Sequence, residues 1–199
     1  MLEIDMVAWD FGDTLVDEQL MRIPPPGVPE WTDAINSLWE ADGWADRWGL
    51  GAVSMNELVL PLAQRLPMSP SEVARFLRAT WRSPRMLEPA ASWLARLQGV
   101  VVQVIVTVNP HEFHGVAAAT GLDAQVDLIV TSADVGSASK VEQAQQARRW
   151  LGLSEGLTTT LLVDNKVSNI AEFRQCGGQA VLFVENDTAL DGLLDPLVP

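Results

Sequence analysis

The chain has 199 residues, of which 48 % are hydrophobic and 20 % charged, and its formal net charge at pH 7 is −13. This length suits one domain, or one domain with a small insertion, and the composition is that of a packed chain rather than a disordered one. The negative charge disfavours a general nucleic-acid-binding protein, because neutralising phosphates requires clustered lysine and arginine.

The cysteine content and the apolar runs indicate the cellular compartment in which the protein is expected. The single cysteine, Cys176, excludes an internal disulfide framework, and we expect it to be a small buried thiol. The N-terminal run MLEIDM has no basic segment ahead of an apolar stretch, and the longest apolar run, VVQVIVTV, is too short to span a bilayer. We therefore expect a soluble cytoplasmic protein with no membrane partner.

The first predicted element is a buried strand at residues 4–10, where the apolar run IDMVAWD precedes a glycine turn. The next segment, at 23–30, is too rich in proline for a helix or a central strand. We interpret it as a stiff connector.

Residues 31–88 have helical periodicity throughout. The segment WTDAINSLWEAD places Trp31 and Trp39 on one apolar face. Two further segments begin with the serine and glutamate spacing of a capping box. Pro61 lies inside the middle segment and is expected to kink or break that helix.

From residue 89 onward, predicted helices alternate with apolar strands. The strands are expected at 100–108, 126–131, 159–164 and 179–184. Such apolar strands, separated by helices, are typical of a parallel sheet covered on both faces, so the pattern predicts an α/β domain. The strand at 4–10 belongs to this sheet by type. The expected domains are an α/β core at 1–17 and 89–199 and a helical insertion at 18–88.

Polar side chains occur where the predicted strands end. They are Asp10, Thr107 and Asp164 at three strand ends, and Lys140 beyond another. Ligands of open parallel sheets bind beyond the carboxyl ends of the strands, so we expect these side chains on one rim. Two carboxylates, a hydroxyl and a lysine suit a hard cation such as Mg²⁺ together with a phosphate.

In this order, the residues resemble the motifs of the haloacid dehalogenase superfamily of hydrolases and phosphatases, in its helical-cap (C1-type) form. DFGDTL is similar to the first motif, Thr107 to the second, Lys140 to the third, and the run that begins LLVDN to the fourth. The resemblance covers nearly the whole chain, although the cap is matched only by position and helicity. It implies a Rossmann-like, doubly wound parallel sheet with an inserted α-helical cap.

The resemblance also implies catalytic roles. Asp10 would attack phosphorus and form an aspartyl-phosphate. Thr107 would donate a hydrogen bond to the phosphoryl oxygens, and Lys140 would add a positive charge beside Asp10. The substrate would be a small phosphorylated molecule.

A metal site follows from the same resemblance. Mg²⁺ would be held by Asp10, the backbone carbonyl of Gly12 and Asp164, with Asn165 as a further candidate ligand. Two residues are expected to support this site from behind, namely Thr14 and Asn169.

The first motif departs from the phosphatase pattern at Gly12, where a second aspartate is usual. That aspartate protonates the leaving group and then activates water, and such acid–base catalysis typically supplies about 10²–10⁴-fold. Asp13 lies one residue further along, and we expect this shift to direct its carboxylate elsewhere. In the fourth motif, Asn165 stands where a second acid is common, which predicts weaker Mg²⁺ binding.

Two other branches of the superfamily also lack the second aspartate. The dehalogenases need no metal and keep no acid at the position of Asp164, which argues against that chemistry here. The phosphonate-cleaving branch uses a cap lysine to form a Schiff base, and no lysine occurs between residues 17 and 88.

The insertion is rich in tryptophan and contains an arginine stripe. Trp31 and Trp39 are expected in its own core, whereas Trp44 and Trp48, in DGWADRWGLG, are candidates for a substrate-facing loop. The arginines share one helix face, which a solvated surface explains better than an anion site: Arg75, Arg78 and Arg82.

Three functional hypotheses remain. The favoured one is a Mg²⁺-dependent hydrolase that acts on a small phosphorylated metabolite through Asp10. The second is a weakened or inactive relative that binds a ligand or a protein partner, which Gly12 and Asn165 suggest. The third is an enzyme that transfers a phosphoryl or acyl group to an acceptor other than water.

Overall fold

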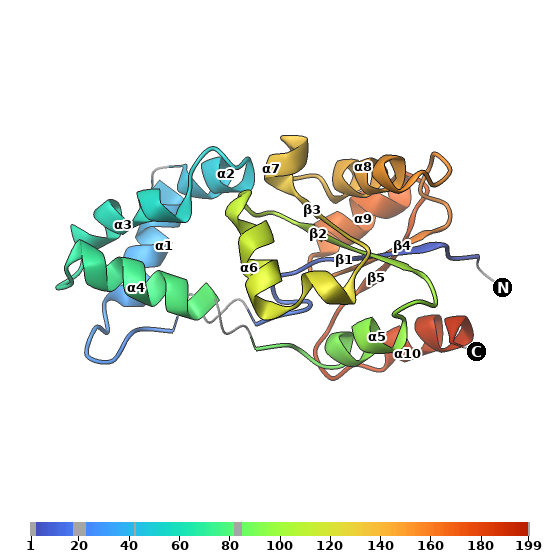
Figure 1. Cartoon of the computed structure of the whole chain (residues 1–199), viewed down its shortest axis with the longest axis horizontal. Helices are drawn as coiled ribbons and strands as arrows, with labels where there is room; N and C mark the ends of the chain where they lie inside the picture. The colour runs from blue at the N-terminus through green and yellow to red at the C-terminus, as the bar shows by residue number, and fades with distance from the viewer. Residues whose placement is uncertain (1–2, 18–22, 42, 82–84, 199) are drawn as a thin grey trace.

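The computed structural model describes residues 3–17, 23–41, 43–81 and 85–198 of the chain (Figure 1). An α/β core carries both ends of the described chain. A group of helices lies at the far end of the molecule from the two termini (Figure 1). We call this group the cap.

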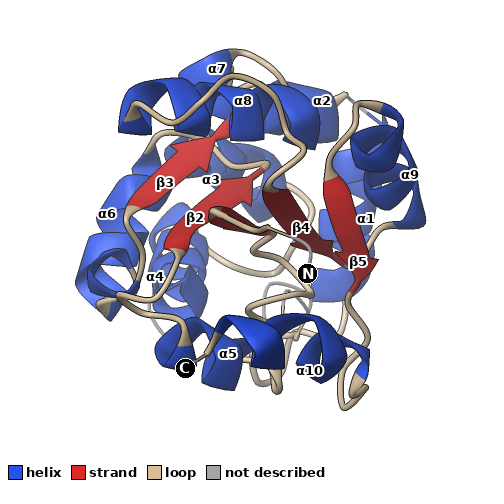
Figure 2. Ribbon diagram, turned by 90° about the vertical axis from the view of Figure 1, so that its right-hand side faces the viewer, coloured by secondary structure: helices blue, strands red, loops and turns tan. Residues whose placement is uncertain are grey.

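The core holds a five-stranded sheet in the order β3–β2–β1–β4–β5, with every pairing parallel (Figure 2). The strands are β1 (Met6–Trp9), β2 (Val102–Thr107), β3 (Leu128–Thr131), β4 (Thr160–Asp164) and β5 (Gln179–Leu182). The predicted strands and the predicted doubly wound α/β architecture are thereby confirmed. The chain turns from one half of the sheet to the other between β1 and β4, so a crevice is expected there.

Helices cover both faces of the sheet (Figure 2). Val7 and Trp9 of β1 join the apolar cluster under α5 and α10, whereas Met6 and Ala8 join the cluster under α8 and α9. The core helices are α5 (Ala90–Arg96), α6 (Glu112–Thr120), α7 (Ser132–Val135), α8 (Lys140–Leu151), α9 (Val167–Gln175) and α10 (Ala189–Leu194), with the 3-10 turns η2 (Asp123–Gln125) and η3 (Asp195–Leu197). In the described part of the chain, every helix is too short or too polar to cross a membrane.

The cap has an apolar cluster of its own. Its helices are α1 (Trp31–Ala41), α2 (Trp44–Gly49), α3 (Met55–Ala63) and α4 (Pro70–Trp81). Trp31, Leu38 and Leu77 are buried in this cluster, which is separate from the two clusters of the sheet. The expected break at Pro61 is wrong, because α3 continues through it. Pro61 lies in the last turn, where its missing N–H removes a single backbone bond.

The two segments that connect the cap to the core run side by side. The N–H of Asp17 donates to the carbonyl of Arg85 at 2.9 Å, and the N–H of Leu87 donates to the carbonyl of Leu15 at 2.8 Å. The guanidinium of Arg85 also donates to the carboxylate of Asp17 at 2.7 Å. The insertion therefore leaves and re-enters the core at one place.

Cys176 is exposed, so the expectation of a buried thiol is wrong. Ile170 and Phe173 form the inward face of α9, and the helix ends at Gln175. Because Cys176 is the first residue beyond the helix, it no longer continues that face.

A buried arginine ties α8 to the beginnings of two strands. The guanidinium of Arg148 donates to the two carboxylate oxygens of Asp5 at 2.6 and 2.9 Å, and to the hydroxyl of Thr160 at 2.9 Å. The hydrogen bonds from Arg148 outweigh the opposing effect of burial and lower the pKa of Asp5. The pair therefore stabilises the edge of the sheet that lies away from the cap.

Asp5→Asn should lower the free energy of unfolding at pH 7 by about 2 kcal/mol, because the buried guanidinium of Arg148 loses its charged acceptor. The pKa of Asp5 is lowered in the folded state. The contribution is therefore present above the unfolded pKa of about 3.9 and is lost as the pH falls through the folded value. Urea denaturation at pH 7 and pH 3 measures this difference. An equal loss at both pH values, or the same loss in the exposed control Glu3→Gln, would contradict the assignment.

Candidate active site at the carboxyl edge of the sheet

The register of the sheet brings two carboxylates together. Trp9 of β1 pairs with Val163 of β4, and the N–H of Asp10 donates to the carbonyl of Val163 at 2.9 Å. Asp10 therefore follows β1 at the level of Asp164, the last residue of β4. Residues at the same level of neighbouring parallel strands point to the same face, so the two side chains lie on the same face of the sheet.

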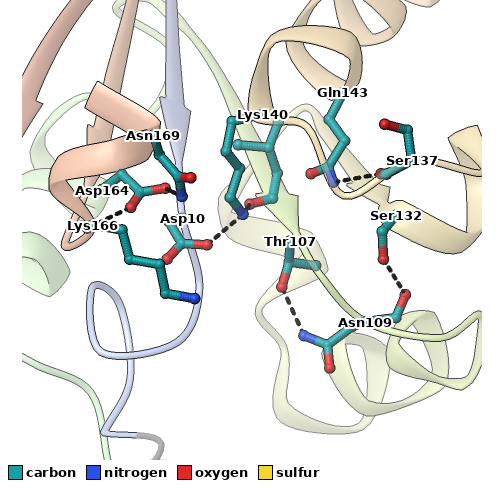
Figure 3. Close-up of polar contacts among 11 residues, drawn as sticks. Asp10, Thr107, Asn109, Ser132, Ser137, Lys140, Gln143, Asp164, Lys166 and Asn169 are labelled. Atoms are coloured by element: carbon teal, nitrogen blue, oxygen red, sulfur yellow. Dashed lines mark hydrogen bonds and ion pairs between the residues drawn. The ribbon is translucent and has the colours of Figure 1, made fainter. Parts of the chain in front are cut away.

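Asp10 forms a buried ion pair with Lys140. The ammonium of Lys140 donates to Oδ1 of Asp10 at 2.5 Å and to the carbonyl of Val106 at 2.7 Å (Figure 3). The side chain of Lys140 is 3 % exposed and that of Asp10 is 9 % exposed. Burying such a pair costs about as much as the attraction returns, so the pair is weak evidence for a contribution to stability. Lys140 is the first residue of α8, so it lies where that helix begins, at the rim of the sheet.

Asp164 is held on both of its oxygens. Oδ1 accepts the backbone N–H of Lys166 at 2.7 Å, and Oδ2 accepts the side-chain amide of Asn169 at 2.8 Å (Figure 3). Burial raises the pKa of Asp164, and the negative charge of Asp10 raises it further, against the opposing effect of Lys140 and the hydrogen bonds. The buried carboxylates of Asp10 and Asp164 thus have the ammonium of Lys140 as a neighbouring positive charge. A further positive charge would be favourable beside them.

Two oxygen atoms in the described segments that follow β1 and β4 lack a hydrogen-bond partner. Among the described residues, the amide oxygen of Asn165 is buried without a hydrogen-bond partner, and so is the hydroxyl of Thr14. Gly12 lines the same cavity as Asp10. The described residues contain no group of three or more His, Cys, Asp or Glu that could hold a metal. This donor set therefore fits Mg²⁺, which uses one or two carboxylates and completes its shell with neutral oxygens, water and substrate.

Thr107 ends β2 on the opposite side of the crevice from Asp164 (Figure 3). It is buried, and its hydroxyl accepts the side-chain amide of Asn109 at 2.7 Å. The carbonyl of Asn109 in turn accepts the hydroxyl of Ser132 at 3.3 Å. Asn109 lines the cavity and was not among the predicted site residues. Its place just after a strand end was the signal that could have identified it.

A cavity of about 330 Å³ lies between the core and the cap. Of the predicted site it contains Asp10, Gly12, Thr107, Lys140 and Asn165, together with residues of α1 and α2, whereas Asp164 is fully buried and does not line it. The core contributes Asp10, Gly12, Asp13, Thr107, Val108, Asn109, Lys140, Asn165 and Lys166, and the cap contributes Ile35, Trp39, Ala45 and Trp48.

Comparison with known proteins identifies the fold. No protein-family model matches the sequence. No curated protein matches it either. Solved structures do match. A HAD-family enzyme from Bacteroides thetaiotaomicron is similar with a TM-score of 0.70 and 12 % identity, over 96 % of this chain and 98 % of that one. The chain has the haloacid dehalogenase fold.

Further structures agree on this fold. A dehalogenase solved as an intermediate complex has a TM-score of 0.74 and 14 % identity, over 100 % of this chain and 99 % of that one. The L-2-haloacid dehalogenase of Xanthobacter autotrophicus, with chloropropionic acid covalently bound, has a TM-score of 0.66 and 15 % identity, over 98 % of this chain and 84 % of that one. The fold that the resemblance implies is thereby confirmed.

In this haloacid dehalogenase fold, Asp13 occupies an unusual position. It is among the residues that line the cavity, and it also borders a second cavity beside Asp17 and Arg85. The expectation that its carboxylate points elsewhere stays a prediction. Its φ of 54° lies in the left-handed region, which costs a residue other than glycine about 1–2 kcal/mol. Strained conformations of this kind persist where the surrounding structure imposes them, and they cluster at functional sites.

The positions of the cap tryptophans, in the cap core or at the cavity, differ from the prediction. Within DGWADRWGLG, residues 44–49 form helix α2 rather than a loop, and Trp48 of that helix lines the cavity. Trp39, expected in the cap core, is only half-buried and lines the cavity beside Trp48, with the ring centroids 5.6 Å apart. The apolar stripe of α1 extends past the core to the cavity wall, because Ile35 is buried and also lines the cavity. Trp44 packs against the cap cluster instead.

Arg75 and Arg78, two of the three arginine candidates, do not line the cavity. Arg75 and Arg78 are exposed on α4, while Val73 and Leu77 on the opposite face are buried in the cap cluster. This is the arrangement of a solvated helix face. Arg82 lies outside the described residues.

The run HEFH, at residues 111–114, spans the start of α6. Nδ1 of His111 lies 3.0 Å from one carboxylate oxygen of Asp134, and Nε2 of His114 lies 2.9 Å from the other. Asp134 also accepts the backbone N–H of Thr131 at 2.8 Å. These contacts connect α6 to the short helix α7 on the cap side of the core.

The cap approaches the core through two glycines. A Cβ added at Gly51 would lie 2.3 Å from the Cβ of Ala133 in α7, and one added at Gly49 would lie 3.0 Å from the side chain of Val108. The segment after α2 therefore packs closely on the core and closes the cavity from one side.

Gly51→Ala should destabilise the protein more than Gly43→Ala. Both glycines have positive φ, 67° at Gly51 and 63° at Gly43. Each alanine substitution therefore costs about 1–2 kcal/mol through left-handed backbone strain. Only the alanine at Gly51 also meets Ala133, since nothing lies within 4 Å of a Cβ at Gly43. Urea denaturation of the two variants measures the difference. Equal losses would contradict close docking of the cap at Ala133.

Proposed function

We propose that the protein is a Mg²⁺-dependent hydrolase that cleaves a small phosphate ester through attack by Asp10 on phosphorus. The observation that carries the proposal is the buried Asp10–Lys140 pair beside Asp164 at the base of the cavity. The Bacteroides enzyme of the same fold was solved in complex with magnesium and inorganic phosphate. At 12 % identity, that complex supports the proposal without extending to the substrate.

Asp10 acts as the nucleophile through Oδ2, because Oδ1 accepts the hydrogen bond of Lys140. A new bond forms between Oδ2 and phosphorus, and the ester bond from phosphorus to the leaving oxygen breaks. Lys140 offsets the repulsion between the carboxylate and the anionic phosphoryl group. Water then cleaves the aspartyl-phosphate, which releases inorganic phosphate and restores the carboxylate.

Four groups would hold the Mg²⁺, namely the carboxylates of Asp10 and Asp164, the carbonyl of Gly12 and the amide oxygen of Asn165. The bound ion supplies positive charge against the phosphoryl oxygens. Asn169 and the N–H of Lys166 keep the carboxylate of Asp164 in a single orientation. The raised pKa of Asp164 supports the assignment, since it reflects surplus negative charge at this point.

Asp13 is our candidate for the proton transfer that Gly12 cannot perform. It lines the cavity and is three residues from Asp10. A carboxylic acid there could protonate the leaving oxygen and then take a proton from the attacking water. The left-handed backbone at Asp13 supports the idea, because a glycine at this position would carry no strain.

Displacement of halide from a small haloacid is the second candidate. A halide leaves without a proton, which fits Gly12, and the Xanthobacter relative is an L-2-haloacid dehalogenase. The carboxylate of Asp164 argues against it, because a second negative charge beside Asp10 would repel an anionic haloacid.

A panel of phosphate monoesters, acyl phosphates and 2-chloropropionate, assayed with Mg²⁺ and with EDTA, tests the proposal. We expect phosphate release that requires Mg²⁺ and falls by about 10³-fold or more in Asp10→Asn, because the nucleophile is lost. The exposed control Asp123→Asn should retain the wild-type rate. No release from any ester, or equal rates in Asp10→Asn and wild type, would contradict the hydrolase and favour a binding protein. Halide release in EDTA would favour the second candidate, and phosphorylation of an added alcohol would favour transfer.

Mg²⁺ should raise the Tm of the wild type and of Asp123→Asn, but not that of Asp164→Asn. The pKa of Asp164 is raised, so ionisation of this carboxylate weakens the metal-free fold as the pH rises through that pKa. Asp164→Asn should therefore leave the metal-free Tm unchanged or higher while it abolishes the Mg²⁺ shift. Thermal denaturation at pH 7 reports both quantities. A Mg²⁺ shift that survives in Asp164→Asn would exclude the proposed metal site.

Asp13→Asn and Asp13→Gly should each lower kcat by about 10²–10⁴-fold on an alkyl phosphate. Asp13→Gly should at the same time raise the free energy of unfolding by about 1 kcal/mol, because the left-handed strain disappears. On p-nitrophenyl phosphate, whose leaving group needs little protonation, the loss of kcat should be smaller. Unchanged kcat in both variants would show that Asp13 is not the acid.

A further inference from the structure

The cavity has two chemically different ends. Its base holds the charged and hydrogen-bonding groups of the core around Asp10 and Lys140. Its roof consists of apolar cap side chains, namely those of Ile35, Trp39, Ala45 and Trp48. None of these roof side chains carries a charge. A ligand with a phosphoryl group at the base would thus place its organic part against an apolar surface.

The roof is built around two indole rings. Trp39 and Trp48 meet edge to face, with their planes 71° apart and their centroids 5.6 Å apart. Trp48 is anchored in the cap cluster, whereas Trp39 is only partly buried. Aromatic rings attract further apolar rings through offset or edge-to-face contacts and bury a large area. The pair therefore favours a flat apolar group over a polyol, whose hydroxyls would lose hydrogen bonds to water.

The charges around the cavity limit the ligand to one phosphoryl group. Among the lining residues the cations are Lys140, which is paired with Asp10, and Lys166. Arg75 and Arg78 are exposed on α4 and do not line the cavity. A second phosphate at the roof would be buried against apolar side chains without a counter-charge, which is costly.

The volume sets the size of the ligand. The cavity of about 330 Å³ lies near the lower end of the range of roughly 300–1,000 Å³ that is usual for small-molecule sites. A phosphoryl group with one small ring fits this range, whereas a bisphosphorylated sugar exceeds the charge that the two lining lysines balance.

From these observations we infer that the substrate is a monophosphate whose organic part is a small, uncharged, apolar ring. The inference rests on the proposed phosphohydrolase function and assigns its specificity to Trp39 and Trp48. The base of the cavity recognises the phosphoryl group, and the two indoles recognise the ring.

Benzyl phosphate, ethyl phosphate and glycerol 3-phosphate, assayed with Mg²⁺, test the inference. All three release a primary alcohol, so their leaving groups are chemically similar and a difference reports recognition by the roof. We expect kcat/KM for benzyl phosphate to exceed that for ethyl phosphate by about 10–100-fold, because an apolar ring is buried. Equal values, or a preference for glycerol 3-phosphate, would overturn the inference and leave the hydrolase intact.

Variants of the tryptophans locate the preference. Trp39→Ala should bring the ratio of benzyl to ethyl kcat/KM close to one, whereas Trp39→Phe should retain most of it. Trp44→Ala is the matched control, because Trp44 is a cap tryptophan that does not line the cavity, and it should keep the wild-type ratio. The ratio is measured within each variant, so a reduced folded fraction does not affect it. If Trp39→Ala leaves the ratio of benzyl to ethyl kcat/KM unchanged, the roof does not recognise the ring and the inference is overturned.

Calorimetry with benzylphosphonate and ethylphosphonate separates this inference from the function on which it rests. Phosphonates are not hydrolysed as esters, so their binding does not depend on catalysis. We expect benzylphosphonate to bind the wild type about 10–100-fold more tightly than ethylphosphonate with Mg²⁺ present, and Trp39→Ala to lose the difference. Tight benzylphosphonate binding without turnover of any ester would support recognition of an apolar ring by Trp39 and Trp48 while the hydrolase proposal fails. Equal binding of the two phosphonates would overturn the inference whatever the enzyme turns over.

Discussion

The buried ion pair between Asp10 and Lys140 is the contact on which the candidate site depends. It joins the end of β1 to the start of α8, across 130 positions of sequence. A lysine that is 3 % exposed would be expensive to keep charged without Asp10 and the carbonyl of Val106 as acceptors. With Asp164 beside it, the pair leaves net negative charge at the base of a cavity. That charge, more than the fold, supports a site for a divalent cation and a phosphoryl group.

The cap gives this charged base a confined space and an apolar roof. The segments that enter and leave it pair with each other near Asp17 and Arg85, so the cap is attached to the core at one place. Its contact at Gly51 is too close to admit a side chain. One stripe of α1 serves both the cap core and the cavity, as Ile35 and Trp39 show. The stability of the cap and the recognition of a ligand thus use the same helix face.

Much of the core could be predicted from the chain because parallel strands buried on both faces are continuous apolar runs, and helices separate them. The same pattern put Asp10, Thr107 and Asp164 at strand ends, and the sheet register then aligns Asp10 with Asp164, while Thr107 lies one residue beyond that level. Lys140 was predicted from its place in the motif order. The left-handed backbone of Asp13 was not predicted, because a backbone conformation of this kind is invisible in the sequence. Trp39 was assigned to the cap core, since spacing alone does not distinguish a core wall from a cavity wall.

The sequence by itself determined the sheet, the inserted helices and the positions of the acids, because periodicity and strand ends are local properties of the chain. The tertiary structure decided which side chains share one cavity. It brought Lys140 onto Asp10, placed Asp13 at the cavity wall and turned Trp39 and Trp48 toward the base. These relations depend on how the cap lies over the core. That docking arises from close contacts between distant segments, which no local pattern specifies.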